Sequence, residues 1–362
     1  MMDKTKKNLL EENEAIAILV GFMIGTSILA LPNSIVQEAK QDGWIAILVG
    51  SIYPLYLALL AIYYVKSHPN QDILALSKIY LGKVLGTICN ILFMVQFGIF
   101  LIITIVSLSN IFRVYATPFL TPIKIFIPTI LLAMYLSNKG IKVLGKINVI
   151  SLYTIVILEG ALLATVKNGN HLNFFPIFET GVKNILSSSM ESALAYGGIE
   201  AVFLIYPVFK EKNKIKNITL KAVFFTMAAY FWVTFICIYT LGYKVTSIAL
   251  WPVLLATEAV NLPLLNSFRY LFLFLWSIVM FKIIANDQYV VMYILSDLLK
   301  IKNKKYFYWA LFPVLICLCF LFKNEVQRRD FLGFVTPKIT LFNIAYISII
   351  AILIFIKHKA KK

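Results

Sequence analysis

The feature that most constrains the fold is an apolar run, long enough to cross a bilayer, that is interrupted at its centre. It includes Val20–Pro32, where Gly25, Thr26 and Ser27 place small and hydroxyl-bearing residues in the middle. Lipid offers the backbone no hydrogen-bond partner, so a spanning helix must satisfy its own polar groups. Gly costs about 1 kcal/mol relative to Ala inside a helix, and Ser and Thr compete for backbone hydrogen bonds. Such a step is tolerated at membrane depth where it lines a cavity in the protein.

A second interruption lies far downstream, where Tyr196–Glu200 places Gly197 and Gly198 in the middle of another apolar run. Taken alone, the first interruption has an alternative explanation, because Gly21 and Gly25 are spaced to form a small-residue helix-packing face. Paired interruptions in corresponding positions of two halves are typical of inverted-repeat transporters, whose ligand site lies between the broken helices. The pair therefore favours a role in lining a cavity.

The composition is that of a polytopic membrane protein, because 60% of the residues are hydrophobic and only 14% are charged. We expect one all-α transmembrane domain over residues 1–362. A charged segment precedes the first apolar run and no small-residue cleavage pattern follows it, so the run is predicted to be a helix and not a signal peptide. The net charge of +17 does not indicate nucleic acid, because the lysines lie in short loops. The four cysteines fall in predicted spans, so we expect no disulfide, metal site or cofactor.

Hydropathy predicts ten transmembrane helices, which fall into two groups of five. The predicted spans are about 14–38, 43–65, 83–111, 122–137, 147–166, 188–209, 218–242, 267–296, 306–322 and 339–356. The two interruptions then lie in spans 1 and 6. This pattern predicts a 5+5 inverted repeat, with one repeat over about 14–166 and the other over about 188–356.

Basic residues predict the orientation of the chain in the membrane. If the N-terminus is cytoplasmic, the loops on its side carry about twice as many lysines and arginines as the loops on the other side. Both termini are therefore expected inside, which agrees with an even number of spans. The cytoplasmic residues then include Lys4, Lys212 and Lys359, and the outward-facing ones include Lys167 and Arg328.

Two connections between spans carry many apolar residues. The inner segment 69–81 is amphipathic and is expected to lie along the membrane surface. The outer segment 246–266 contains Trp251 and Pro252, and its apolar content argues against a fully solvated loop. It is expected to form a re-entrant or surface helix over an outer vestibule.

The chain resembles the amino acid–polyamine–organocation superfamily and, more narrowly, the B subunits of spore germinant receptors (the endospore germination permease family). The residues that carry the resemblance are Val20–Pro32, Asp42–Trp44, Gly198–Pro207 and Leu250–Pro252. It covers nearly the whole chain and implies a LeuT-like fold with broken helices 1 and 6. One departure is Arg269, near the start of span 8, where the resemblance leads us to expect an acidic residue. Ligand preference or the outer gate is therefore expected to differ.

The resemblance implies a ligand site between the two breaks. At the first break, free backbone N–H groups and the positive end of the outer half-helix suit a carboxylate, with Thr26 and Ser27 adding hydroxyl donors beside Gly25. At the second, Gly197 and Gly198 are expected to free carbonyls that accept from an ammonium group, and Ile199 beside them is expected in the site. Together these groups predict a site for a zwitterion such as an amino acid.

Three polar or aromatic residues near these breaks each have two interpretations, and a fourth has one. Glu200 either neutralises a ligand ammonium or carries a proton, or it caps the inner half-helix. Gln96 and Phe100 lie one turn apart in span 3, where they bind ligand or make an interhelical hydrogen bond and a core contact. The resemblance favours the site. Glu191 ends the sequence Ser-Ser-Met-Glu and is interpreted as part of a capping box at the outer start of span 6.

Lys282 is the charged residue closest to the middle of a predicted span. It shares a helix face with Asn286 and Tyr289. By resemblance, it is expected to occupy the position where relatives hold a sodium ion; the alternative is an interior ion pair that only supports the bundle. Glu159 in span 5 is predicted at a similar depth, and we hypothesise that it pairs with Lys282 directly or through water. Asp287 is expected to be interfacial.

The function that the resemblance implies is that of a nutrient-sensing subunit in a spore germination receptor of the inner spore membrane. Such a subunit binds a small germinant, here expected to be an amino acid, and assembles with A and C subunits in the lipid bilayer. It is not an enzyme. Two alternatives remain: a proton-coupled amino acid transporter with the same fold and site, and a membrane scaffold whose pocket is vestigial.

Overall fold

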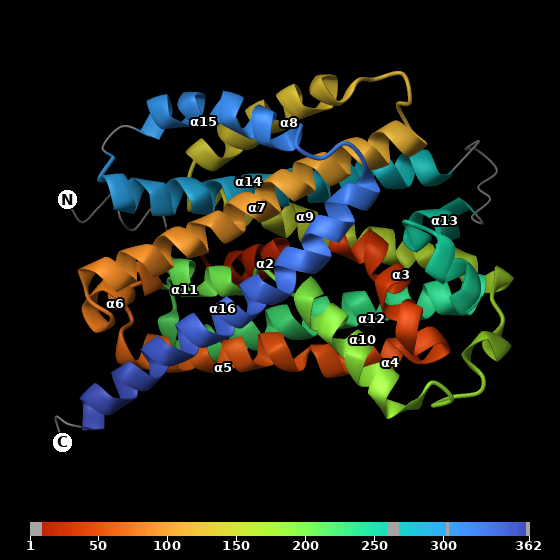
Figure 1. Ribbon diagram of the computed structural model, residues 1–362, viewed down its shortest axis with the longest axis horizontal. Coiled ribbons are helices and arrows are strands. Elements are labelled where there is room, and N and C mark those ends of the chain that lie inside the picture. The colour runs from red at the N-terminus through yellow and green to blue at the C-terminus, as the bar shows by residue number, and fades with distance from the viewer. Residues whose placement is uncertain (1–8, 259–267, 302–303, 360–362) are drawn as a thin grey trace.

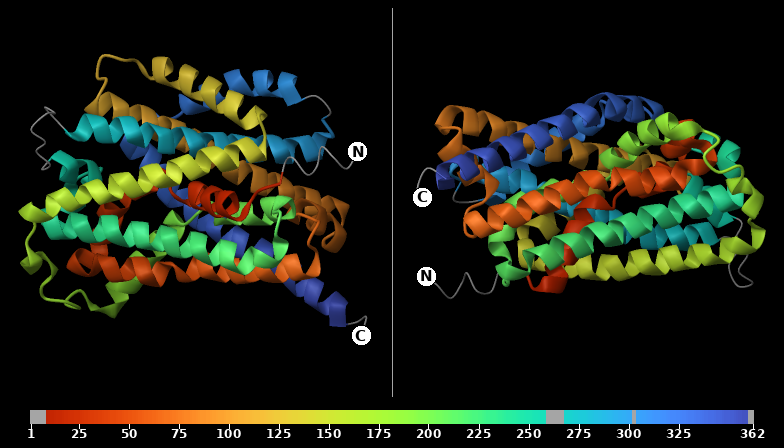
Figure 2. Two further views of the ribbon diagram at one scale, coloured as in Figure 1. Left: turned by 180° about the vertical axis from the view of Figure 1, so that it is seen from behind. Right: turned by 90° about the horizontal axis from the view of Figure 1, so that it is seen from below.

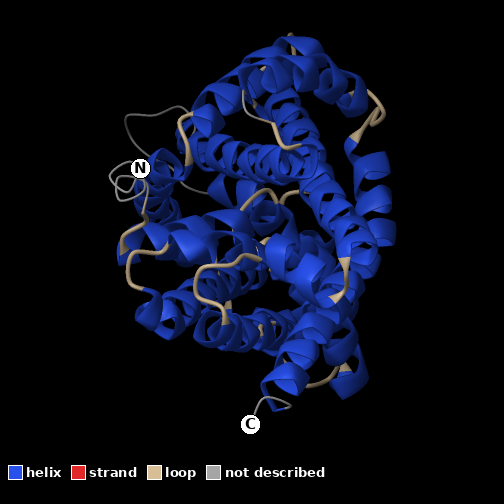
Figure 3. Cartoon of the chain, turned by 90° about the vertical axis from the view of Figure 1, so that its left-hand side faces the viewer, coloured by secondary structure: helices blue, strands red, loops and turns tan. Residues whose placement is uncertain are grey.

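The computed structural model describes residues 9–258, 268–301 and 304–359 (Figure 1). Helices joined by short loops make up this part of the chain, and no named strand occurs in it (Figure 3). Six of the described helical segments are long and apolar enough to cross a membrane, and three shorter apolar helices lie over 122–138, 199–208 and 306–319. The predicted all-helical membrane architecture is confirmed.

The helices correspond to the ten predicted spans. The first five spans are α2 (Glu12–Met23) with α3 (Ser27–Ala39), α4 (Gly43–Gly50) with α5 (Ile52–Ser67), α7 (Lys83–Tyr115), α8 (Pro122–Asn138) and α9 (Ile141–Ala161). The last five are α10 (Gly181–Ala195) with η4 (Ile199–Ala201), α11 (Val202–Ile205) and η5 (Tyr206–Val208), then α12 (Ile215–Ile248), α14 (Phe268–Leu299), α15 (Lys304–Cys319) and α16 (Glu325–Lys359).

Both predicted breaks are real interruptions of a helix. The first span stops at Met23, Ile24 is extended, and α3 starts at Ser27. The sixth span stops at Ala195 and resumes as η4 after Gly198, whose φ is +109°. A non-glycine residue rarely adopts such a φ, so the second glycine of the pair is what allows the chain to turn here.

The broken spans lie inside a bundle that other helices surround (Figures 1 and 2). Helix α14 packs against α2, α7, α8 and α9, while α3 packs against α10 and α12. Helix α16 crosses the front of the bundle in Figure 1, and α8 and α15 lie together along its upper edge. The end of α16 and the short helix α6 (Ile73–Tyr80) mark what we call the inner end. Helix α13 (Pro252–Glu258) marks the outer end.

The inner halves of the two broken spans are joined at the inner end. Leu10 forms a parallel β-bridge with Phe209, through hydrogen bonds from Leu10 N to Val208 O (2.9 Å) and from Lys210 N to Leu10 O (3.0 Å). An ion pair of 2.8 Å between Lys210 and Glu11 lies beside the bridge, and hydrogen bonding from Lys210 lowers the pKa of the Glu11 carboxyl. The start of span 1 and the end of span 6 therefore form one unit.

The outer surface of the bundle is apolar over much of its area. Large hydrophobic side chains such as Leu59, Ile157 and Phe355 are exposed, as expected for helices that face lipid. Together with the long apolar helices, this surface identifies an integral membrane protein.

Two helix starts differ from the prediction. Helix α10 starts at Gly181 instead of near 188, so the predicted capping box of Glu191 at the helix start is wrong; the Ser188 hydroxyl instead donates to Ile35 O (3.1 Å). Helix α16 starts at Glu325 instead of near 339. Its charged first turns looked like a loop in the sequence. They are helical because Glu325 pairs with Arg328 and Arg329 at helical spacing.

The two apolar connections form short helices. Helix α6 buries Ile73, Leu74 and Leu76 and packs against α7, and Asp72 caps its first turn by accepting from Ala75 N (3.0 Å). Its location along a membrane surface stays a prediction. Helix α13 covers part of the outer segment, while residues 259–266 of that segment lie outside the described residues.

Candidate ligand-binding site

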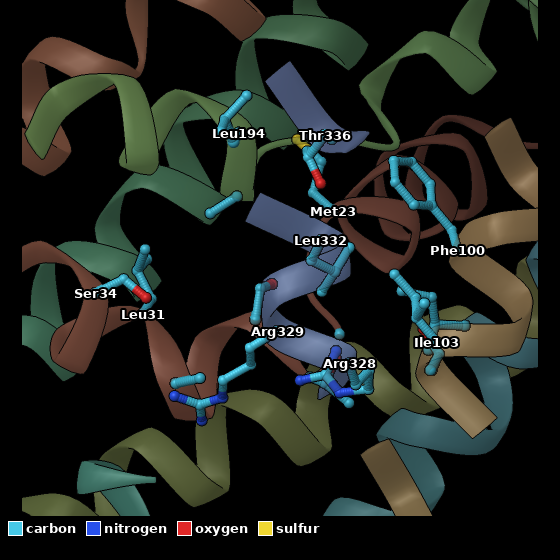
Figure 4. A pocket seen from close by; sticks show the side chains of 18 of the residues that line it. Met23, Leu31, Ser34, Phe100, Ile103, Leu194, Arg328, Arg329, Leu332 and Thr336 are labelled. Carbon is cyan, nitrogen blue, oxygen red and sulfur yellow. The ribbon is translucent and has the colours of Figure 1, made fainter. Parts of the chain in front are cut away.

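A cavity of about 240 Å³ lies beside the two breaks (Figure 4). It is bounded by the first break and the start of α3, by one face of α7, by the end of α10, by α14 and by the first turns of α16. Leu31 and Ser34 of α3 line it as well, so the cavity extends from the breaks toward the outer end of the bundle.

Residues of the first break line the cavity as predicted. Gly25, Thr26 and Ser27 all border it. The residue that caps α3 is Thr26, and its side chain makes no capping hydrogen bond to the helix. The first N–H groups of a helix have no partner within that helix, and the helix dipole adds positive potential there. The start of α3 therefore presents donors that suit a ligand carboxylate.

Only part of the second break reaches the cavity. Gly197 lines it, whereas Gly198 packs against the first break and Ile199 is fully buried. A β-carbon on Gly198 would lie 2.7 Å from the carbonyl carbon of Phe22 and closer still to its oxygen. Gly198 is thus a point of close approach between the two broken spans, and it does not line the cavity.

Most carbonyls around the second break have partners, among them that of Gly198, which was predicted to be free. Backbone N–H groups within the break donate to the carbonyls of Ala193, Leu194, Tyr196 and Gly198 at 3.1–3.5 Å. The Ala195 carbonyl accepts from the Tyr230 hydroxyl at 3.0 Å. The tight turn that Gly198 permits satisfies these carbonyls locally, which a sequence pattern alone does not reveal.

Glu200 lies beneath the break and does not line the cavity. Its carboxylate accepts from Gly198 N (2.6 Å), from Asn343 Nδ2 (2.9 Å) and from the Tyr53 hydroxyl. This geometry agrees with the capping interpretation, because an acidic side chain satisfies an N–H group at the start of the inner half-helix.

Gln96 and Phe100 separate in the structure. Phe100 lines the cavity next to Gly197. Gln96 is buried one turn further inward on α7 and outside the cavity lining, and neither of its amide atoms has a hydrogen-bond partner within the described ranges.

Lys282 contacts the first break outside the cavity lining. Its ammonium group donates to the carbonyls of Gly21 (2.7 Å) and Ile24 (2.9 Å). Carbonyls at the end of a helix have no partner within that helix. The side chain is buried, but it does not line the cavity. A positive charge therefore stabilises the carbonyl end of α2, as expected for a cation at a helix C-terminus.

The hypothesis of a direct pair between Lys282 and Glu159 is wrong. The Glu159 carboxyl borders a separate, much smaller cavity beside Ile28 and Trp276, and its Oε1 has no hydrogen-bond partner in the described part of the chain. Helix α9 instead contacts α14 through Asn148, whose Nδ2 donates to Asn286 Oδ1 (2.9 Å). Gly21 leaves room for that amide pair, so the helix-packing interpretation holds for this glycine.

The hydroxyl of Tyr230 on α12 links the two breaks, a role that no sequence signal indicated. It lies 2.8 Å from Met23 O, 3.0 Å from Ala195 O and 3.2 Å from Ser27 Oγ. A single hydroxyl proton is shared between the two carbonyls, while the Ser27 hydroxyl is placed to donate to the Tyr230 oxygen. The end of α2, the start of α3 and the end of α10 thus meet at one side chain.

The charged residues of the cavity were missed or misplaced in the sequence. Glu191 on α10, Asp287 on α14, and Arg328 and Arg329 on α16 all line it. Asp287 was expected at an interface and is instead 2% exposed. The sequence does not distinguish the two locations, because an acidic residue near one end of a span has the same pattern at the membrane interface and in a buried cavity.

Arg328 and Arg329 line the cavity from the first turns of α16 (Figure 4). Both bond to Glu325, Arg328 through its Nε (2.8 Å) and Nη2 and Arg329 through its Nε (3.2 Å). Arg329 also donates to Asn33 Oδ1 (3.2 Å) on α3. The outward-facing loop position predicted for Arg328 is wrong in that the side chain is buried in a helix.

The fold and the site define a class of membrane protein, that of transporter-like bundles with broken helices 1 and 6. Among solved structures the chain is similar to Mhp1, a transporter of the nucleobase-cation-symport-1 family in a closed conformation with bromovinylhydantoin bound. The TM-score is 0.58 at 11% identity, over 92% of this chain and 78% of Mhp1. That likeness supports the LeuT-like fold.

The particular family follows from the sequence. The model of the spore germination protein family (spore permeases) matches residues 9–328, so the chain belongs to this family. It is 21% identical to spore germination protein GerQB of Bacillus cereus, over 86% of this chain and 85% of GerQB. It is also 21% identical to spore germination protein YndE of Bacillus subtilis (strain 168), over 86% of this chain and 87% of YndE.

Proposed function

We propose that this chain is the nutrient-sensing subunit of a spore germination receptor and binds a small molecule, an amino acid, beside its two broken helices. It would lie in the inner spore membrane with both termini on the core side and assemble with A and C subunits. The observation that carries the proposal is a cavity of about 240 Å³ at the uncapped start of α3. Small-molecule sites are usually apolar cavities with a few convergent polar groups, and this one matches that description.

The lining of the cavity suits a zwitterionic ligand with a small side chain. The start of α3 supplies N–H groups for a carboxylate. Phe100, Ile103 and Leu194 supply an apolar wall. The volume lies below the usual 300–1,000 Å³ of sites for drug-sized ligands, which favours a molecule of amino acid size.

Lys282 would replace a bound sodium ion in this proposal. Its ammonium group already bonds to the two carbonyls at the end of α2. A covalently attached cation keeps α2 and α14 together whether or not a ligand is present, which suits a receptor that does not use a sodium gradient.

A proton-coupled amino acid transporter is the second candidate. The observation that favours it is Glu159, which borders a small cavity beside α3 and lacks a hydrogen-bond partner at Oε1 within the residues described. Ionisable groups at membrane depth often carry protons in transporters. Saturable uptake of a labelled amino acid into liposomes would support this candidate, whereas ligand binding without uptake supports the receptor.

The test of the proposed site compares two glycines. Gly25 lines the cavity, and a side chain there would meet Ile283 at 2.6 Å; Gly98 on α7 has nothing within 4 Å of an added β-carbon. We expect Gly25→Leu to abolish the germination response at a matched protein level and Gly98→Leu to retain it. A normal response in Gly25→Leu removes the first break from the site. A lack of thermal stabilisation of the purified wild-type protein by any amino acid would favour the scaffold.

A further inference from the structure

Asp287 is a buried acceptor in the cavity. It follows Ile283 by one turn of α14, and both residues line the cavity. The residue is 2% exposed, and its Oδ2 has no hydrogen-bond partner in the structure as described. Burying an ionised carboxylate without a partner is costly, so an unpartnered carboxyl that borders a cavity calls for an explanation.

None of the neighbouring cations Lys282, Arg328 and Arg329 forms an ion pair with Asp287. Lys282 is five residues away, about 140° around the helix, and its ammonium group is committed to Gly21 O and Ile24 O. Arg328 and Arg329 bond to Glu325. Within the described residues, no ion pair of 4.0 Å or less includes Asp287.

Other acceptors at the breaks are weaker candidates for a cationic ligand group. The carbonyls of Leu194 and Gly198 already accept from backbone N–H groups, and that of Ala195 accepts from Tyr230. Glu200 is outside the cavity lining and accepts three hydrogen bonds. Glu191 lines the cavity, but its side chain is exposed, so water already solvates it.

We propose that Asp287 binds the ammonium group of the ligand and so restricts the site to compounds with a free amine. This inference rests on the proposed function, since it assigns a ligand group to the same cavity. The start of α3 would bind the carboxylate and Asp287 the ammonium of the same Cα, with Phe100 and Ile283 against the side chain. Ligand binding would supply the counter-ion that the carboxyl lacks.

The first measurement needs no variant. Purified full-length protein is titrated with L-alanine, L-valine and L-leucine and with their N-acetyl derivatives, which keep the carboxylate and side chain but lose the positive charge. We expect binding, read by calorimetry or thermal shift, of at least one free amino acid and none of its N-acetyl derivative. Equal binding of the two forms overturns the inference.

The second measurement removes the carboxylate. Truncating one member of a buried charge pair has large effects, so Asp287→Asn is expected to weaken binding of that amino acid by about thirty-fold or more. Asp297→Asn is the matched control, because Asp297 lies on the same helix but pairs with Lys78 (2.5 Å) at the surface. Asp287→Glu keeps the charge and is expected to retain selectivity for the free amine.

The outcomes separate this inference from the proposed function. Binding that Gly25→Leu abolishes and Asp287→Asn leaves unchanged overturns the role of Asp287 alone. Failure of the wild-type protein to bind any of the three amino acids overturns both the amine site and the proposed amino acid ligand. If Asp287→Asn does not fold, the comparison of free and N-acetylated ligands on wild-type protein still decides the question.

Discussion

The close approach of the two breaks predicts different consequences for two adjacent glycines. Gly198→Ala places a methyl group against the Phe22 carbonyl, part of a backbone that cannot rotate away, at a residue whose φ is +109°. The positive φ costs an L-residue about 1–2 kcal/mol, and overpacking typically costs about 1–3 kcal/mol. The expected destabilisation is therefore about 2–5 kcal/mol. Gly197→Ala meets its nearest atom, Leu194 O, at 3.2 Å and is expected to cost less than about 1 kcal/mol.

Thermal unfolding of the purified variants measures the difference. With an unfolding entropy of about 2.1 cal/mol/K per residue over 362 residues, 1 kcal/mol corresponds to about 1.3 °C. Gly198→Ala should then lower Tm by about 3–7 °C, and Gly197→Ala by no more than about 1 °C. Equal shifts for the two variants, or a Gly198→Ala protein as stable as the wild type, would refute the close packing of the two broken spans.

Three further predictions concern the supports of the site and the orientation of the chain. Lys282→Met should destabilise the protein by a few kcal/mol because two carbonyls lose a charged donor. In a double-mutant cycle, the stability losses of Lys282→Met and Glu159→Gln should add. Partial recovery of stability in the double mutant would restore the pairing hypothesis. Tyr230→Phe should cost about 1–3 kcal/mol in thermal unfolding, with the exposed Tyr153→Phe as a neutral control. For the orientation, single cysteines are introduced at positions 167, 212, 323 and 359 of a cysteine-free protein and treated with an impermeant thiol reagent. Labelling from outside is expected at 167 and 323 and not at 212 and 359, and external labelling at position 212 would contradict the orientation.

Local sequence signals located the breaks because the breaks are local events. Gly25, Thr26 and Ser27 disfavour a continuous helix through their own backbone preferences, and the chain leaves the helix within two residues of them. The same holds for Gly198, where φ must be positive. Features of this kind depend on a few consecutive residues, so they are readable without knowledge of the neighbours.

The polar groups of the cavity depended on distant parts of the chain. Arg328 lies in a charged segment that resembles a loop, but it is buried in α16 and bonds to Glu325, which also accepts from Asn110 of α7. Asp287 is buried on α14, which packs against α2, α7, α8 and α9. Lys282 was recognised from its depth alone, yet its partners are backbone carbonyls, which every residue carries and no side-chain pattern distinguishes.

The positions of the contacts decide which parts of the bundle a ligand is able to influence. The inner halves of the broken spans are joined through Leu10 and Phe209, and neither of these residues lines the cavity. Ser27 borders the cavity and also contacts Tyr230, which bonds to both breaks. A ligand shifts a conformational equilibrium only as far as its affinities for the two states differ. A ligand group that bonds to the Ser27 hydroxyl competes directly with Tyr230, so this contact is where occupancy of the cavity and the link between the two breaks share a side chain.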